Sequence, residues 1–314
     1  MERELDGDGG GVSAGRLHLT KHHGAGNDFL VLLDPDDRRP LSSSEVRLLC
    51  DRHRGIGADG LLRVMSGRHG SALTMDLHNA DGGGAEMSGN GIRCLVQAAV
   101  DAGLAAPGPV SVATAAGPRT VVYRSGEKPG LGFASVDMGR ATLGPELDEG
   151  ALPVEVAPSV RFARTVDMGN PHIVLFGTPV ETATVAAVGA PLEHSVPGGA
   201  NVEFVWPGTE SDTLTMRVWE RGVGETLACG TGACAAAAAA HGWGLVGSVV
   251  LVHSPGGTLE VEVRSDGISL AGPSQKVAEV VVDDAVLAEL AMSYDDEMAL
   301  AHDNVDQNSV VRGP

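Results

Sequence analysis

The chain has 314 residues, which suits two mid-sized lobes better than one undivided core. Hydrophobic residues make up 43% of it but aromatic residues only 3%, so we expect a core of alanine, valine and leucine. The net charge of −19 and the lack of a basic run argue against nucleic acid or an anionic membrane as a partner.

The N-terminal residues 1–15 are acidic and glycine-rich, and we expect them to be a disordered leader. They lack the basic start and the apolar stretch of a signal peptide, and no apolar run approaches the ~20 residues of a membrane span. The four cysteines have no CxxC spacing, which predicts free thiols and no metal site. These features predict a cytoplasmic protein.

The first half begins with strands at 17–20 and 29–33 around a polar loop at 21–28. A helix follows at 42–52, where Ser42 and Glu45 form a capping-box pattern. Strands are expected at 60–65 and 73–78, then an apolar helix at 92–102. Alternating residues between 107 and 139 predict paired strands.

The second half contains a similar set of elements, ending in a closing strand and an acidic tail. Its apolar helix is expected at 233–241 and a loop at 191–199. The tail, 283–314, should be helical at 285–292. The expected strands are 166–169, 173–176, 202–206, 214–218 and 277–282. The expected domains are the leader 1–15, an N-terminal lobe 16–131 with a closing strand at 275–284, a C-terminal lobe 132–274, and the tail 285–314.

One short pattern occurs twice, each time just before an apolar helix: Ser88-Gly89-Asn90-Gly91 and Cys229-Gly230-Thr231-Gly232. A β-rich segment with a glycine turn follows each helix. A helix N-terminus offers unpaired N–H groups to an anion, so each copy is an anion site beside a proton-transfer group. Two such sites suit inversion of a carbon centre, which needs a base on one face and an acid on the other.

These elements predict the α+β class. Both repeat helices are small and apolar on nearly all sides, which is typical of a helix buried on every side. We therefore expect two pseudo-symmetric lobes, each a mixed β-sheet wrapped around a central apolar helix.

Several motifs together resemble one known family, the diaminopimelate epimerases, which are amino-acid epimerases that use no pyridoxal phosphate. The similarity runs from about residue 17 to about residue 282. The motifs are His23–Phe29, Asn79–Gly82, Gly89–Cys94, Gly169–His172, Glu220–Thr226 and Ala228–Gly232. The resemblance implies interconversion of LL- and meso-diaminopimelate by two-base α-proton transfer, in lysine and peptidoglycan precursor synthesis.

The resemblance implies two catalytic cysteines, one in each lobe. Cys229 matches the second, but Ser88 stands where the family has the first. A hydroxyl is a far weaker acid than a thiol, so a serine base needs an activating neighbour. Ser88 is either an engineered replacement that inactivates the enzyme or a native variation. Two alternative functions stay open: an epimerase of another amino acid in specialised metabolism, and an amino-acid-binding homologue with impaired catalysis.

The remaining site residues are also implied by the resemblance. The distal end of the substrate would be held by Asn79, Asn170, Asn201, Glu220 and Arg221. The reacting carboxylate would lie on N–H groups of Gly89, Asn90, Gly230 and Thr231, with Asn27 near the reacting centre. His172 either orients the site or is a buried structural histidine. We expect no cofactor and no metal. The expected partner is a small amino-acid substrate, and a homodimer is compatible with the sequence.

Overall fold

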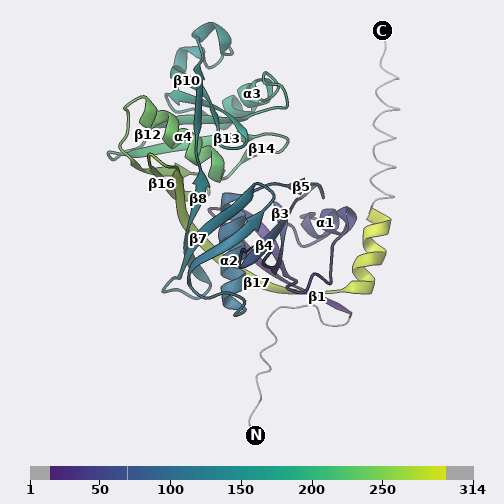
Figure 1. Ribbon diagram of the computed structural model, residues 1–314. Coiled ribbons are helices and arrows are strands. Elements are labelled where there is room, and N and C mark those ends of the chain that lie inside the picture. The colour runs from purple at the N-terminus through teal and green to yellow at the C-terminus, as the bar shows by residue number, and fades with distance from the viewer. Residues whose placement is uncertain (1–14, 69, 295–314) are drawn as a thin grey trace, which may run out of the picture.

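The computed structural model describes residues 15–68 and 70–294, so most of the predicted leader and residues 295–314 of the predicted tail lie outside the described residues. Two lobes lie one above the other, and long strands run between them (Figure 1). Each lobe is a mixed sheet closed around one helix, which confirms the predicted α+β class. No helix among the described residues is long and apolar enough to cross a membrane.

The first half of the chain builds a sheet around helix α2. Strands β2 and β3 pair in parallel, as do β4 and β6, and the other neighbours are antiparallel. Its elements are β1 (Arg16–Gly24), β2 (Asn27–Leu33), α1 (Ser43–Cys50), β3 (Gly60–Ser66), β4 (Leu73–Asn79), β5 (Gly84–Ala85), α2 (Gly89–Asp101), β6 (Gly108–Thr114), β7 (Gly117–Ser125) and β8 (Leu131–Gly139).

The second half repeats this order around helix α4. The parallel pairs are now β11 with β12 and β13 with β15, at the same steps of the chain. The connection between the halves is β9 (Thr142–Glu146) with two 3-10 turns, Glu149–Ala151 and Ala157–Ser159. The elements are β10 (Val160–Asp167), β11 (Pro171–Gly177), α3 (Thr182–Glu193), β12 (Asn201–Pro207), β13 (Thr213–Glu220), β14 (Gly224–Thr226), α4 (Gly230–Gly242), β15 (Val249–Ser254), β16 (Gly257–Val263) and β17 (Ile268–Asp283).

The two halves exchange their closing strands. Strand β17 pairs first with β16 and β8 and then, with its last residues, pairs with β1 of the other lobe. In the same way β9, which follows β8, pairs with β10. The start of β1 and the end of β17 therefore lie side by side, and the Asp284 N–H donates to the Gly15 carbonyl at 3.1 Å.

The central helices are buried on all sides. Alanine covers most of α4, whereas α2 is mainly apolar but also buries Asn90, Arg93 and Gln97. Every residue of α2 from Gly89 to Ala99 is buried, and so is every residue of α4 from Gly232 to Ala240. An alanine helix is thin, so the surrounding strands approach it closely. This packing explains how a chain with few aromatic residues still fills two cores.

Three local predictions about loops and strands were wrong or incomplete. The predicted loop 21–28 is an antiparallel hairpin of β1 and β2, whose tight turn has positive φ at Ala25 and Gly26. The predicted loop 191–199 begins inside helix α3, which the sequence did not indicate because Glu181 makes no side-chain cap. The predicted strand 277–282 is the last part of the 16-residue β17.

Two helix predictions are confirmed. The capping box is present, because Ser42 and Glu45 exchange hydrogen bonds at the start of α1. The chain is helical from 284 to 294, which includes the predicted 285–292. That helix packs Leu287 and Ala291 into a core cluster shared with α1.

Candidate functional site

The two repeated motifs form matching helix N-termini. Ser88 and Cys229 are the N-cap residues of α2 and α4, and both have extended backbone conformations. The Ser88 hydroxyl accepts from the Gly91 N–H at 3.0 Å, and the Cys229 sulfur accepts from the Gly232 N–H at 3.3 Å. Each reactive atom is thus held at the positive end of a helix.

The two helix ends meet head to head at a pair of glycines. A Cβ atom on Gly230 would lie 3.4 Å from the Gly89 Cα and 3.0 Å from Leu270 Cδ2. A Cβ on Gly89 would lie 2.8 Å from the same Leu270 atom. The absence of side chains at both positions lets the helix ends approach without displacing Leu270, and this approach brings both N-termini to one point.

A cleft of about 200 Å³ opens between the lobes at this point. It is lined by every residue that the sequence proposed for catalysis or substrate binding, with the exception of His172, which is fully buried behind it. These residues are Asn27, Asn79, Ser88, Gly89, Asn90, Asn170, Asn201, Glu220, Arg221, Cys229, Gly230 and Thr231.

The floor of the cleft can hold a carboxylate. The first N–H groups of each helix, those of Gly89, Asn90, Gly230 and Thr231, have no acceptor within their own helix. Arg93 adds a buried positive charge just below them and donates to the Gly89 carbonyl and the Asn90 side-chain oxygen, each at 2.8 Å. Burial lowers the pKa of Arg93 to about 10, so the guanidinium stays charged at neutral pH.

Cys229 lies next to a buried carboxylate. Glu220 lies beside its thiol and accepts from the Thr226 hydroxyl, and the sulfur lies 3.4 Å from the Thr231 hydroxyl. Burial, followed by the charges of Glu220 and Glu203, raises the pKa of the Cys229 thiol well above its usual value. Burial likewise raises the pKa of Glu220, which makes it a better acceptor for the thiol proton.

Behind Cys229 lies a buried chain of polar groups that ends in the cleft. His172 Nδ1 lies 2.7 Å from Glu203 Oε1, and His172 Nε2 lies 3.0 Å from Asn170 Oδ1. The Asn170 amide in turn reaches the Thr231 hydroxyl at 3.5 Å. His172 is therefore a fully buried histidine that also fixes how Asn170 points into the cleft.

Ser88 has different surroundings. The aromatic ring of Phe29 lies behind Gly91, where Glu203 lies behind Gly232 in the other lobe. Among the described residues, the Ser88 hydroxyl makes one hydrogen bond, which it accepts from the Gly91 N–H. No carboxylate, histidine or lysine of the described chain hydrogen-bonds to this hydroxyl, so the two proton-transfer positions are unequal.

Asp59 is a site residue that the sequence analysis missed. Its carboxylate accepts from the Asn27 side-chain amide at 2.8 Å, and Asn27 accepts from Asn90 at 3.3 Å. Arg52 holds Asp59 and Asp28 together through ion pairs. The signal for Asp59 was weak, because an acidic residue in a glycine-rich segment more often serves a turn.

Glu220 and Arg221 are neighbours in sequence but not partners. Glu220, which the resemblance placed with Arg221 at the distal end of the substrate, lies beside Cys229, and no ion pair joins it to Arg221 in the described part of the chain. The Arg221 N–H donates to Asn201 Oδ1 at 2.8 Å, and its guanidinium donates to the Gly198 carbonyl at 3.1 Å. The Arg221 guanidinium is thus held at the cleft wall, and its other N–H groups can donate to a substrate.

A family model described as diaminopimelate epimerase matches residues 19–144 and 164–277. A diaminopimelate epimerase of Synechocystis is 37% identical over 276 residues, which cover 83% of this chain and 97% of the relative. One from Synechococcus elongatus is 38% identical over 282 residues, with 83% and 96% covered.

Solved structures at lower identity share the fold. A protein of the phenazine biosynthesis PhzF family from Bacillus anthracis has a TM-score of 0.64 at 16% identity, with 85% of this chain and 99% of that one covered. A hydroxyproline epimerase from Agrobacterium vitis has a TM-score of 0.65 at 15% identity, with 87% and 94% covered.

Proposed function

The chain belongs to the diaminopimelate epimerase family, and we propose that it interconverts LL- and meso-diaminopimelate by moving the α-proton between Cys229 on one face of the substrate and Ser88 on the other. The observation that carries this proposal is the head-to-head meeting of two N-capped helices in one cleft. That geometry supports a site in which one proton-transfer atom lies on each side of the substrate carboxylate.

On the Cys229 face, the thiol and Glu220 act as one unit. The carboxylate takes the thiol proton, and the thiolate takes the α-proton of the substrate. Charge then builds up on the substrate carboxylate, where N–H groups of both helices and the Arg93 cation stabilise it. The attraction between these groups and the carboxylate strengthens as the α-proton leaves, and this lowers the barrier to proton removal.

On the Ser88 face, the proton donor held by a helix N-terminus is the Ser88 hydroxyl. Delivery of its proton to the carbanion leaves a Ser88 alkoxide, and removal of the α-proton on this face starts from the same alkoxide. No carboxylate, histidine or lysine of the described chain hydrogen-bonds to this oxygen to share the proton, so both directions are costly on this face. We therefore expect fast α-proton exchange on the Cys229 face and slow net inversion.

Three asparagines and Arg221 form the distal part of the proposed binding site. Asn79, Asn170 and Asn201 line the same cleft, and Arg221 supplies a cation for the distal carboxylate. A substrate with charged groups at both ends matches this arrangement better than one with an apolar side chain.

Deuterium uptake at the α-carbon tests the proposal. We expect Cys229→Ala to abolish uptake from both LL- and meso-diaminopimelate, because Cys229 is the one thiol among the described residues that line the cleft. We expect Ser88→Cys to raise net inversion by about 10²- to 10⁴-fold, the range for general acid–base catalysis.

The matched control is Cys234→Ala, which removes a buried thiol of the same helix that does not line the cleft. This variant should keep the uptake of the parent chain. Normal uptake by Cys229→Ala would contradict the proposal, and no gain in Ser88→Cys would show that Ser88 works with a proton acceptor of its own.

The compartment and the partners are also proposals. Four buried cysteines, none of them in a disulfide, support a reducing compartment such as the cytoplasm. The acidic net charge supports a small amino acid as partner over nucleic acid or a membrane surface. A homodimer stays a proposal that light scattering can test.

A further inference from the structure

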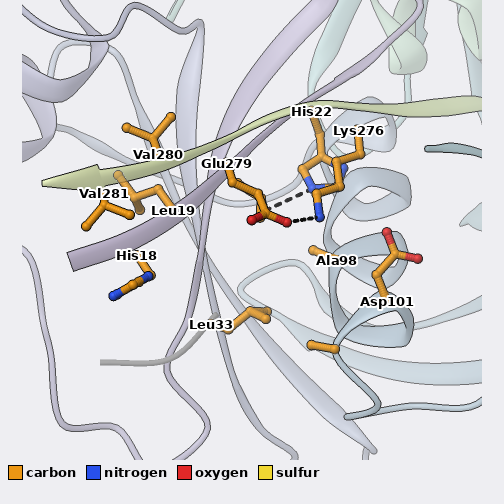
Figure 2. Close-up of a pocket in the computed structure, with 12 residues that line it drawn as sticks. His18, Leu19, His22, Leu33, Ala98, Asp101, Lys276, Glu279, Val280 and Val281 are labelled. Carbon is orange, nitrogen blue, oxygen red and sulfur yellow. Dashed lines mark hydrogen bonds and ion pairs between the residues drawn. The ribbon is translucent and has the colours of Figure 1, made fainter. Parts of the chain in front are cut away.

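The first lobe contains a cavity of about 140 Å³ at the end of α2 that lies away from the cleft. Figure 2 shows Glu279 and Lys276 on one side of it and His18, Leu33, Ala98 and Asp101 around it. Val281 lies at its edge and is 53% exposed, while the neighbouring Leu19 and Val280 pack into the core cluster that contains α1. The cavity volume is close to that of apolar cavities that admit a benzene ring. Here the Glu279 side chain is 74% exposed, so the space is a pocket open to solvent on that side.

The same end of the second lobe is filled by aromatic side chains. Phe162 stacks on Trp243, with ring centroids 5.4 Å apart, and Phe176 packs on both rings at 6.2 and 6.3 Å. The Trp243 indole N–H donates to Glu146 Oε1 at 3.1 Å. The second lobe therefore carries its own aromatic plug, with one hydrogen bond to a carboxylate.

The internal repeat places small or polar residues at the matching positions of the first lobe. Ala102 is the C-cap of α2, as Trp243 is the C-cap of α4. The parallel pairing of β2 with β3 begins at Phe29, and that of β11 with β12 begins at His172. Leu33 and Phe176 each lie four residues further along, so they match.

The strand that covers the cavity can be matched in the same way. The pairing of β1 with β17 shifts register between Lys21 and His22. The pairing of β10 with β9 shifts register at the equivalent position, between Arg164 and Val166. Glu279 pairs with Thr20, just before the shift on β1, and Glu146 pairs with Arg164, just before the shift on β10. Glu279 therefore matches Glu146.

Counted from the same irregular register, His18 matches Phe162. The three aromatic residues of the plug thus correspond to His18, Leu33 and Ala102. All three line the cavity, while the carboxylate that accepts the indole N–H is retained as Glu279.

We propose that this end of the first lobe binds a small aromatic molecule with an N–H donor, of which indole is the simplest. The ring would fill the space that Phe162 and Trp243 fill in the second lobe, and its N–H would donate to Glu279. Lys276, which pairs with Glu279 at 2.7 Å, would remain at the rim, where it can also face an acidic substituent of the ring. The site lies at the opposite end of α2 from the cleft, so it does not depend on the proposed epimerase reaction.

Titration of the full chain with indole, followed by ligand-observed NMR and calorimetry, tests the site. We expect one indole per chain, and weaker binding of benzofuran, which has the same shape but no N–H. Ala102→Trp places in the first lobe the side chain of the second and should weaken indole binding about tenfold or more. Leu33→Phe should also weaken indole binding, and it replaces Ala102→Trp in the test if that variant does not fold.

Ala115→Trp is the matched control, because Ala115 is exposed in a turn of the same lobe and does not line the cavity. It should bind indole like the parent chain. Trp243→Ala removes the plug of the second lobe and should add a second indole per chain. Failure of the parent chain to bind indole would overturn the proposal, as would equal binding by both filled variants or equal binding of benzofuran and indole.

Discussion

Ser88 and Cys229 occupy equivalent N-cap positions, but the residues behind them differ. Cys229 has Glu220, Glu203 and His172 within its polar surroundings, whereas Ser88 has the Phe29 ring. The motif spacing predicted both positions, because an N-cap pattern is local. The carboxylate partner of Cys229 could not be predicted so directly, since Glu220 reaches it only through the packing of β13 against α4.

A prediction at this scale concerns the charge on Glu220. After burial, that charge is the largest cause of the raised thiol pKa, so Glu220→Gln should move the pH midpoint of Cys229 alkylation to lower pH. The same variant loses the acceptor for the thiol proton, so α-proton exchange should fall. Iodoacetamide labelling read by mass spectrometry measures the first effect. Glu225→Gln, which alters a carboxylate paired with Arg217, is the control, and an unchanged midpoint in Glu220→Gln would argue against the contact.

At the scale of elements, regular patterns were predictable and tertiary effects were not. The capping box of α1 and the two apolar helices follow from local sequence. Helix α3 has no side-chain cap and contains Pro191, so its sequence resembles a loop and only packing makes it a helix. The hairpin at Ala25 and Gly26 was missed because polar residues of β1 pair inside the sheet.

The contact between the ends of α2 and α4 leads to a second prediction. Gly230→Ala places a methyl group against Leu270 and Gly89, which should push the helix ends apart and lower epimerisation by at least about tenfold while the chain stays folded. Kinetics and circular dichroism would measure the two effects. Gly150→Ala, where the added methyl group meets no atom within 4 Å, should behave like the parent chain. Full activity of Gly230→Ala would mean that the helix ends tolerate separation.

His22 on strand β1 predicts a loss of stability in acid. Burial lowers its pKa from 6.5 to about 4, so the folded chain keeps it neutral while the unfolded chain takes up a proton. Stability due to this group is present above pH 6.5 and is lost as the pH falls towards 4, by up to about 3 kcal/mol.

The matching residue of the second lobe is Val166, so His22→Val is the natural variant. Urea unfolding at pH 7 and pH 4.5 should show a smaller acid loss in His22→Val than in the parent chain. His53→Val, at an exposed histidine, should leave that loss unchanged. Equal acid losses in all three proteins would exclude His22 as the cause.

At the scale of the whole molecule, the sequence predicted two similar lobes and a late strand that returns to the first. It did not predict that β8 and β9 complete the second sheet as β17 completes the first, because pairing between distant strands leaves no local pattern. The predicted limits of the lobes, 16–131 and 132–274, stay a prediction.

Truncation tests the exchanged strand. A chain that ends at Pro273 lacks the part of β17 that pairs with β1, so Leu17 and Leu19 lose their cover. Each buried leucine contributes about 1.5–3 kcal/mol, and we expect this chain to lose cooperative unfolding. A chain that ends at Tyr294 keeps every contact of β17 and should melt cooperatively in calorimetry. Cooperative melting of the shorter chain would show that the first lobe closes without β17.

The hydrogen bond between Asp284 and Gly15 has a consequence for how the chain can be connected. Because the start of β1 and the end of β17 lie together, a short linker could join them without moving a strand in a chain that leaves out the helix at 284–294. A chain joined there and opened between β9 and β10 would begin with the present second lobe and end with the first. The order of helices and strands would be the same as before, since the halves share one order. The molecule is therefore a circular permutant of itself in topology, and neither lobe is intrinsically the first.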